Sequence, residues 1–292
     1  MNKADRHYKE YWNKNEDLLS EALNPLGWVS ENQEWTEPNG VEVLEMLART
    51  KGLDYGRAKN RGYIDENDKV VPLTYKMDEY GFRIFNQDKT KKSIAVLGCS
   101  DTFGIGSFVK DTWAYKLSEA IGKPVWNFGI PGASMHINYE SLLNHLGDKN
   151  ITDLFWLIPD CRRTSLIRWN KKHKNYERLQ VGANREAAMI SEQHNFDTNN
   201  YFDLCRVSET KAYVDQMMII DAVENICKYY NVNLYQVLNP FYLDNKIVQT
   251  KLRDDGRYLK VNDYEKGYDN SHLGVPFHNQ VKEYFYFLYK NN

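Results

Sequence analysis

Short apolar runs alternate with helix-like segments from Ser93 to the C-terminus, and this alternation restricts the fold more than any other feature of the chain. Four runs have the length and apolar content of buried strands: Ser93–Leu97, Val125–Asn127, Leu154–Ile158 and Asn233–Leu238. Four segments have the apolar spacing typical of helices: residues 112–121, 134–146, 208–230 and 275–289. This order predicts an α/β fold in which helices cover both faces of a parallel sheet.

The chain divides into two parts, because the alternation of strand-like and helix-like segments is confined to the second. We assign residues 1–88 to an N-terminal extension and residues 89–292 to the main domain. The extension has helical spacing in two segments and strand-like sequence in a third: residues 7–23, 41–50 and 71–85. A polar, basic insertion at about 160–207 interrupts the main domain. We expect the extension to pack on the main domain or on a partner.

Composition and charge exclude several classes of protein. The 292 residues carry a net charge of −2, which argues against disorder from excess charge and against binding nucleic acid through net charge. No apolar run approaches the roughly 18 residues that a membrane-spanning helix needs, and the first residues lack the apolar core of a secretory signal. Four cysteines lie far apart and form no CxxC pair: Cys99, Cys161, Cys205 and Cys227. We therefore expect a cytoplasmically made protein with reduced thiols, no signal peptide and no membrane partner.

The loop after the first strand is the first place where chemistry is expected, because parallel sheets bind ligands at the carboxyl ends of their strands. It reads Gly98-Cys-Ser-Asp-Thr-Phe-Gly104 and places Ser100 just beyond a buried strand. The loop lacks the Lys-Ser/Thr ending of a Walker loop and the spacing of GxGxxG or GxSxG. Ser100 is therefore a candidate nucleophile whose turn can offer N–H groups to an oxyanion. A strand-to-helix turn with a capping serine is the alternative.

Two further segments could complete a site around this serine. Asp269-Asn-Ser-His272 precedes the last helix and offers a base together with the carboxylate that fixes its tautomer. A capped helix start explains the same pattern equally simply. Asn127-Phe-Gly-Ile-Pro-Gly132 follows the second strand, where glycine lets the backbone approach a ligand closely.

Together these segments resemble the SGNH (GDSL-type) serine hydrolase superfamily over roughly residues 75–290. The matching residues are Ser100, Thr102 and Gly104 in the first block, Asn127, Gly129 and Gly132 in the second, and Asp269 and His272 in the last. The stretch Tyr80-Gly-Phe-Arg83 is similar to a lead-in found in some bacterial and viral members. The resemblance implies a flavodoxin-like three-layer α/β/α fold and hydrolysis of an acyl ester, commonly an acetyl ester on a carbohydrate. It implies no metal and no organic cofactor.

The resemblance also implies a role for each matched residue. Ser100 would be the nucleophile, His272 the general base, and Asp269 the carboxylate that orients the imidazole. The backbone N–H groups of Ser100 and Gly129 would form the oxyanion hole. The substrate would be a small-molecule or polysaccharide ester, and residues 1–88 leave a homo-oligomer or a virion partner open. The Asn-, Lys- and Tyr-rich composition suits a viral or bacterial source, so virion association stays open as well.

Two positions depart from the family pattern. Cys99 replaces the Asp that usually precedes the serine, which leaves a cysteine nucleophile as a minor alternative. Pro159 stands where the third block carries an oxyanion-donating Asn, and proline has no donor. Losing one such donor typically lowers the rate by about 10²–10³-fold. Arg162 or Arg163 could substitute for it.

The missing donor keeps two other functions open on the same scaffold. One is a non-catalytic carbohydrate-binding or structural protein, and the other is an O-acyltransferase that uses the same triad. The basic segment at 160–178 is either a lid suited to an acidic polysaccharide or a solvated surface segment.

Overall fold

The computed structural model describes residues 33–52, 54–159, 163–170, 175–181, 209–239 and 265–292. Two of the predicted segments, residues 7–23 and most of the insertion at about 160–207, lie outside these ranges. Within them, no helix has both the length and the apolar character that crossing a membrane requires.

A four-stranded parallel sheet forms the centre of the main domain. Its strands are β3 (Ser93–Gly98), β4 (Val125–Gly129), β5 (Ile151–Ile158) and β8 (Asn233–Leu238), in the order β4-β3-β5-β8. All residues of β3 and β4 are buried, which explains why these strands read as continuous apolar runs and not as alternating ones. Each of the four predicted strands is present, and their order is that of a flavodoxin-like sheet.

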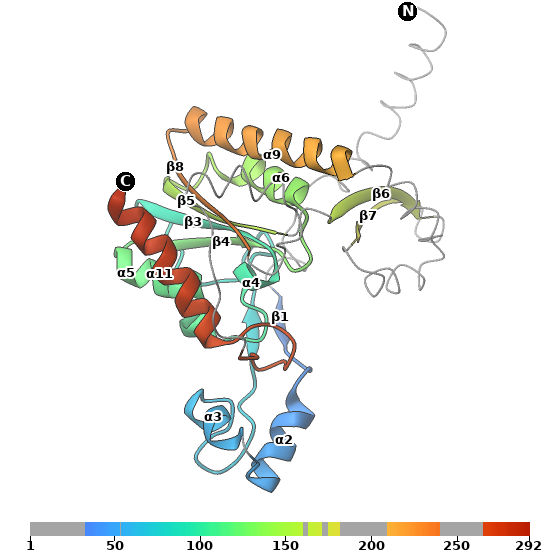
Figure 1. Cartoon of the computed structure of the whole chain (residues 1–292), viewed down its shortest axis with the longest axis vertical. Helices are drawn as coiled ribbons and strands as arrows, with labels where there is room; N and C mark the ends of the chain where they lie inside the picture. The colour runs from blue at the N-terminus through green and yellow to red at the C-terminus, as the bar shows by residue number, and fades with distance from the viewer. Residues whose placement is uncertain (1–32, 53, 160–162, 171–174, 182–208, 240–264) are drawn as a thin grey trace, which may run out of the picture.

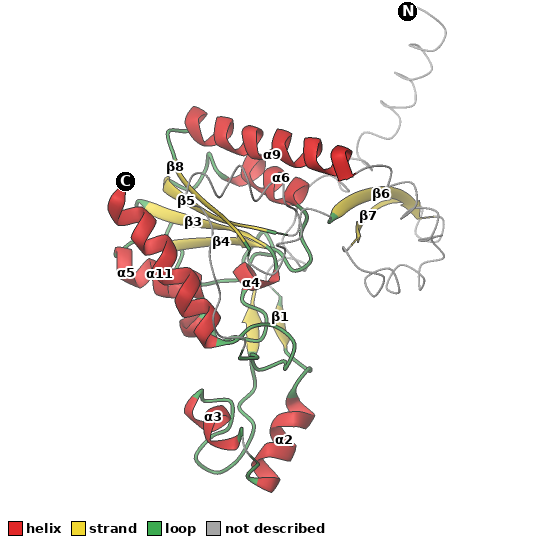
Figure 2. Ribbon diagram, in the orientation of Figure 1, coloured by secondary structure: helices red, strands yellow, loops and turns green. Residues whose placement is uncertain are grey.

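Helices cover both faces of this sheet (Figures 1 and 2). The helices are α5 (Trp113–Ile121) and α11 (Val275–Asn291) on one face, and α6 (Met135–His145) and α9 (Glu209–Tyr229) on the other. Alternate residues of β3 serve the two layers, because Ala95 and Leu97 pack with α6 and α9 while Ile94 and Val96 pack with α5 and α11. The predicted three-layer α/β/α architecture is confirmed.

Residues 33–88, which we call the N-terminal module, pack against the main domain below the sheet (Figure 1). The module contains β1 (Glu34–Thr36), α2 (Val41–Thr50), α3 (Tyr55–Asn60) and β2 (Thr74–Lys76), and β1 pairs antiparallel with β2. Its apolar cluster includes Leu44, Leu73 and Tyr75, and it continues into Phe103 and Tyr268 of the main domain. The helix predicted at 41–50 is confirmed, whereas the strand-like stretch at 71–85 forms only the short strand β2 and a turn.

Part of the basic insertion forms a hairpin that the sequence analysis did not predict. Strands β6 (Thr164–Asn170) and β7 (Asn175–Val181) pair antiparallel. The hairpin begins a few residues after β5, at the carboxyl end of the sheet. Strands β6 and β7 therefore lie beside the carboxyl edge of the sheet (Figure 1).

Candidate active site

Ser100 begins α4 (Ser100–Phe103), a single helical turn that follows β3 after one residue. The turn closes on the carbonyl of Ser100, which accepts hydrogen bonds from the N–H groups of Gly104 (2.8 Å) and Ile105 (3.1 Å). Asn127 in the middle of β4 donates its side-chain amide to the carbonyls of Thr102 (3.2 Å) and Phe103 (3.4 Å). Ser100 is thereby held at the carboxyl edge of the sheet with 7% of its surface exposed.

Arg83 fixes the far end of the same turn. Its side chain is fully buried and donates to the carbonyls of Phe103 (3.1 Å), Gly104 (2.6 Å) and Ser107 (2.8 Å). Burial lowers the pKa of Arg83 to about 10, so the guanidinium stays charged at neutral pH. In the sequence, Tyr80–Arg83 shows only a resemblance to a family lead-in. The contacts show what Arg83 does: it holds the loop that follows α4.

Asp269 and His272 lie on the loop before α11, and we call residues 265–274 the catalytic loop. Asp269 Oδ2 lies 2.6 Å from His272 Nδ1, while Asp269 Oδ1 accepts from the backbone N–H groups of Ser271 (3.2 Å) and His272 (3.1 Å). Because the Asp269 carboxylate only accepts, the neutral imidazole carries its proton on Nδ1 and leaves Nε2 as an acceptor. This is the tautomer that a general base requires.

The pKa values of this pair move in the directions that stabilise the charged forms. Burial by itself would lower the pKa of His272, but the hydrogen bond and charge of Asp269 outweigh it and raise the pKa above its usual 6.5. Burial would likewise raise the pKa of the Asp269 carboxyl, yet its hydrogen bonds with His272 and Ser271 hold that pKa below the ordinary value. The pair therefore favours an imidazolium next to a carboxylate, which is the state that forms when the base takes a proton.

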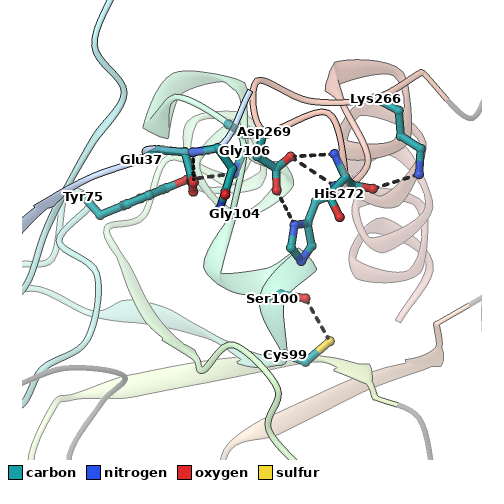
Figure 3. Close-up of polar contacts among 12 residues, drawn as sticks. Glu37, Tyr75, Cys99, Ser100, Gly104, Gly106, Lys266, Asp269 and His272 are labelled. Carbon is teal, nitrogen blue, oxygen red and sulfur yellow. Dashed lines mark hydrogen bonds and ion pairs between the residues drawn. The ribbon is translucent and has the colours of Figure 1, made fainter. Parts of the chain in front are cut away.

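The three predicted triad residues come together in the expected order. Figure 3 shows the His272 ring between Asp269 and Ser100, with the edge opposite Asp269 turned toward the serine. Among the described residues, the hydrogen-bond partner of Ser100 Oγ is Cys99 Sγ at 4.0 Å, and no hydrogen bond joins Oγ to the ring. Catalytic hydrogen bonds are often long in ligand-free enzymes and tighten when substrate binds.

The two predicted oxyanion donors differ in availability. The N–H of Ser100 donates to none of the described residues. The N–H of Gly129 instead donates to Asn127 Oδ1 at 2.9 Å, so it can reach an oxyanion only by sharing or losing that bond. A Cβ at Gly129 would lie 2.4 Å from the nitrogen of Phe103, which makes close packing against α4 a second reason for glycine here. Gly132, at φ 74° in an exposed turn, has an N–H that no described residue accepts.

Pro159, which stands where the family pattern has an oxyanion-donating Asn, directly follows β5. Pro159 is buried there and offers no N–H group. Of its two suggested substitutes, Arg162 lies outside the described residues, whereas Arg163 is half-buried and its charge acts on Cys99. Burial dominates at Cys99 and raises the pKa of its thiol, with the charge of Asp101 acting in the same direction. A fully buried thiol with a raised pKa argues against the alternative of a cysteine nucleophile.

Asp101 and Asn239 form a part of the site that the sequence analysis missed. Asp101 is buried beside Ser100, and its Oδ2 accepts from Asn239 Nδ2 at 2.7 Å. Asn239 directly follows β8, and its backbone N–H donates to the carbonyl of Ile158 (3.1 Å). The rule that chemistry gathers after the strands points to the loop beyond Leu238, and this signal could have found Asn239.

Two neighbouring features do not belong to the candidate catalytic group. His278 on α11 is fully buried, accepts from the N–H of Trp113 (3.2 Å) and pairs with Ser107 Oγ (3.1 Å), so it is a structural histidine. A cavity of about 680 Å³ opens in the N-terminal module. Its lining includes Glu37 and Tyr268 but neither Ser100 nor His272, so it is separate from the serine.

Comparison with known proteins gives structural neighbours only. No family model and no curated protein matches the chain. Solved structures that resemble it include the psychrotrophic esterase EstA from Pseudoalteromonas sp. in a form inhibited by monoethylphosphonate, with a TM-score of 0.40, 13% identity, and coverage of 69% of this chain and 100% of the other. A protein described as a lipolytic member of the G-D-S-L family from Desulfitobacterium hafniense has a TM-score of 0.38, 12% identity and coverage of 68% and 99%. A protein described as a GDSL-like lipase from Bacteroides ovatus has a TM-score of 0.34, 15% identity and coverage of 77% and 65%.

Proposed function

We propose that this protein is a serine ester hydrolase of the SGNH type. The observation that carries the proposal is the 2.6 Å contact between Asp269 and His272, on a loop that turns the free edge of the imidazole toward Ser100. A capped helix start, the alternative explanation of D-x-x-H, does not describe this segment, because α11 begins at Val275 with Gly274 as its N-cap and Asp269 accepts its backbone bonds within a turn. A helix cap would also leave unexplained the oriented ring and its position opposite a serine just after β3.

In the proposed reaction Ser100 Oγ attacks the carbonyl carbon of the ester while His272 Nε2 takes the hydroxyl proton. The bond between that carbon and the alcohol oxygen then breaks, and His272 returns the proton to the departing alcohol. Water attacks the resulting acyl-enzyme with His272 again as base, which releases the acid and restores Ser100. Asp269 stabilises the imidazolium at both steps.

The oxyanion hole is the weakest part of the proposed site. The Ser100 N–H is available, the Gly129 N–H is shared with Asn127, and Pro159 supplies no third donor. The one donor lost at Pro159 costs about 3–4 kcal/mol of transition-state stabilisation, whereas even modest enzymes gain about 8 kcal/mol over the uncatalysed reaction. We therefore expect a slow enzyme whose rate still exceeds that of the uncatalysed reaction.

Covalent labelling with a serine-directed fluorophosphonate tests this proposal, because labelling requires an activated serine but not a natural substrate. We expect label on Ser100 in the wild type and none in Ser100→Ala. Ser141→Ala, which removes a buried serine hydroxyl from α6, should label normally. Absence of label in the folded wild type would overturn the proposal and favour a non-catalytic binding or structural role.

Kinetics on a short-chain aryl ester add a second test of the triad. Ser100→Ala, His272→Ala and the double variant should lose similar activity, because each residue is ineffective without the other. Losses that multiply would show that the two residues do not act as a unit.

We further propose that the natural substrate is an acetyl ester on a carbohydrate. Acetate release from an O-acetylated polysaccharide, compared with the same polymer after chemical deacetylation, tests this substrate class. Acetyl transfer to an added sugar in preference to water would identify the protein as an O-acyltransferase instead.

A further inference from the structure

The N-terminal module contacts the catalytic loop through polar groups as well as through apolar packing. Tyr75 on β2 is the central residue of these contacts. Its hydroxyl donates to Glu37 Oε2 (3.0 Å) and accepts from the N–H of Gly106 (2.8 Å). Gly106 lies in the loop after α4, and its carbonyl accepts from the N–H of Tyr268 (2.7 Å) in the catalytic loop. A chain of three hydrogen bonds therefore runs from Glu37 to the residue before Asp269, and Figure 3 shows its first two bonds, from Glu37 through Tyr75 to Gly106.

Two other contacts tie the same module to the same loop. Arg61 pairs with Glu265 through two parallel bonds, Nε to Oε1 at 3.1 Å and Nη2 to Oε2 at 3.2 Å. Gly40 lies directly against the loop backbone, because a Cβ there would fall 2.0 Å from the carbonyl oxygen of Tyr268 and 2.9 Å from Cα of Asp269. The catalytic loop is thus held by the module at its start and at the residue that precedes its carboxylate.

Glu37 is an unusual residue to find in such a place. It is 1% exposed, and its carboxylate accepts from Tyr75 Oη and from the N–H of Asn39 (3.0 Å). No cationic side chain among the described residues lies within ion-pair distance of it. Burying a carboxylate without a cation is costly, so a residue of this kind is retained where its charge or geometry has a use.

We infer that Glu37 and Tyr75 are positioning residues of the proposed esterase, and that the N-terminal module is a working part of the active site and not an appended extension. Tyr75 holds Gly106, the carbonyl of Gly106 holds Tyr268, and Tyr268 fixes the place of the adjacent Asp269. Glu37 holds the Tyr75 hydroxyl and adds negative potential behind the imidazole. This inference rests on the proposed function, since a positioning role has meaning only where His272 acts as a base.

Charged groups from three of the described segments act on His272. Burial disfavours its imidazolium, whereas Asp269 of the catalytic loop, Asp101 of α4 and Glu37 of the module all raise its pKa. His278 of α11 is a fully buried neighbour whose pKa is lowered to about 3, so it adds no positive charge near neutral pH. Removing the charge of Glu37 should therefore lower the pKa of His272.

Three conservative variants of the full chain test the inference. Glu37→Gln removes the charge but keeps an acceptor, and Tyr75→Phe removes the hydroxyl that joins Glu37 to Gly106. Tyr63→Phe is the matched control, because Tyr63 is a buried tyrosine of the same module whose hydroxyl has no hydrogen-bond partner among the described residues. Thermal unfolding of all three reports whether any loss of function is a loss of fold.

Two readouts are needed, one of which is independent of activity. In Tyr75→Phe, kcat on an aryl acetate should fall about tenfold with little change in KM, because the loop that carries Asp269 is held less firmly. In Glu37→Gln, the His272 ring should titrate at lower pH by NMR, with its signal assigned through His272→Ala. Tyr63→Phe should change neither readout.

The outcomes separate the inference from the proposed function. If the wild type neither hydrolyses esters nor labels with fluorophosphonate, the proposed function fails and takes the positioning role with it, whatever the titration shows. If the wild type is active but Glu37→Gln and Tyr75→Phe behave as Tyr63→Phe does, the proposed function stands and the inference is overturned.

Discussion

Gly106→Ala gives the sharpest test of how the loop after α4 supports Asp269. Gly106 adopts φ 70°, and a Cβ added there would lie 2.4 Å from Asp269 Oδ1. Because carbon and oxygen normally approach no closer than about 3.4 Å, the carboxylate or the loop must move by about 1 Å. Asp269 then loses its alignment with His272, and displacements of this size cost about 10²-fold in rate.

The expected loss in kcat/KM for Gly106→Ala is therefore about 10²-fold, equivalent to about 2.7 kcal/mol of activation free energy. A left-handed alanine adds about 1–2 kcal/mol of destabilisation that has nothing to do with catalysis. Gly122→Ala isolates that contribution, because Gly122 has φ 77° and nothing lies within 4 Å of the position of its Cβ. Comparing the two variants subtracts backbone strain from the effect on Asp269.

Both variants should be assayed for aryl-ester hydrolysis and for unfolding in urea. We expect both variants to lose stability from backbone strain, Gly106→Ala by more because its Cβ also crowds Asp269, and we expect only Gly106→Ala to lose activity. If Gly106→Ala retains activity within about threefold of Gly122→Ala, the contact with Asp269 does not position the triad, and the reasoning from this geometry is refuted.

Three further predictions concern His272, His278 and Cys99. Because His272 acts as a base only when neutral and Asp269 raises its pKa, activity should fall as pH decreases through a midpoint above 6.5; a midpoint below 6.5 in the kcat/KM profile would contradict this. Burial lowers the pKa of His278 to about 3, so the unfolded state binds one more proton than the folded state between about pH 6.5 and 3. As pH falls through this range, this group should lower the free energy of unfolding by about 1.4 kcal/mol per pH unit. In urea titrations at several pH values, the free energy of unfolding of His278→Asn should depend less steeply on pH. Cys99→Ala should keep fluorophosphonate labelling at Ser100, and loss of labelling would return Cys99 to consideration as the nucleophile.

The sequence was sufficient to predict the layered fold because periodicity reports burial directly. Strands β3 and β5 are buried on both faces, so their apolar runs have no polar alternation to confuse them with surface strands. Periodicity is less informative for helices that bury only one face against the sheet. The helix predicted at 208–230 has apolar residues around much of its circumference, so spacing does not reveal which side meets the sheet. In α9 the apolar side chains of Val214 and Met218 are 47% and 65% exposed.

The candidate triad was also predictable, because its residues follow strands or precede the last helix in short recognisable segments. The contacts around it were not. Gly129 fits the motif equally well whether its N–H is free or donated to Asn127, and only the geometry distinguishes the two. Arg83 reads as an ordinary charged residue until its three carbonyl partners are known.

By itself the sequence determined which segments of the main domain become strands and helices, and it identified the candidate reactive side chains, because both follow from residue type and local spacing. The tertiary structure alone decided which distant groups meet: Glu37 with Tyr75, Tyr75 with Gly106, and Arg61 with Glu265. These pairs are separated by tens to hundreds of residues, so no local pattern encodes them. They form because the N-terminal module packs its buried face on the main domain, where these polar groups lose contact with water and pair with one another instead.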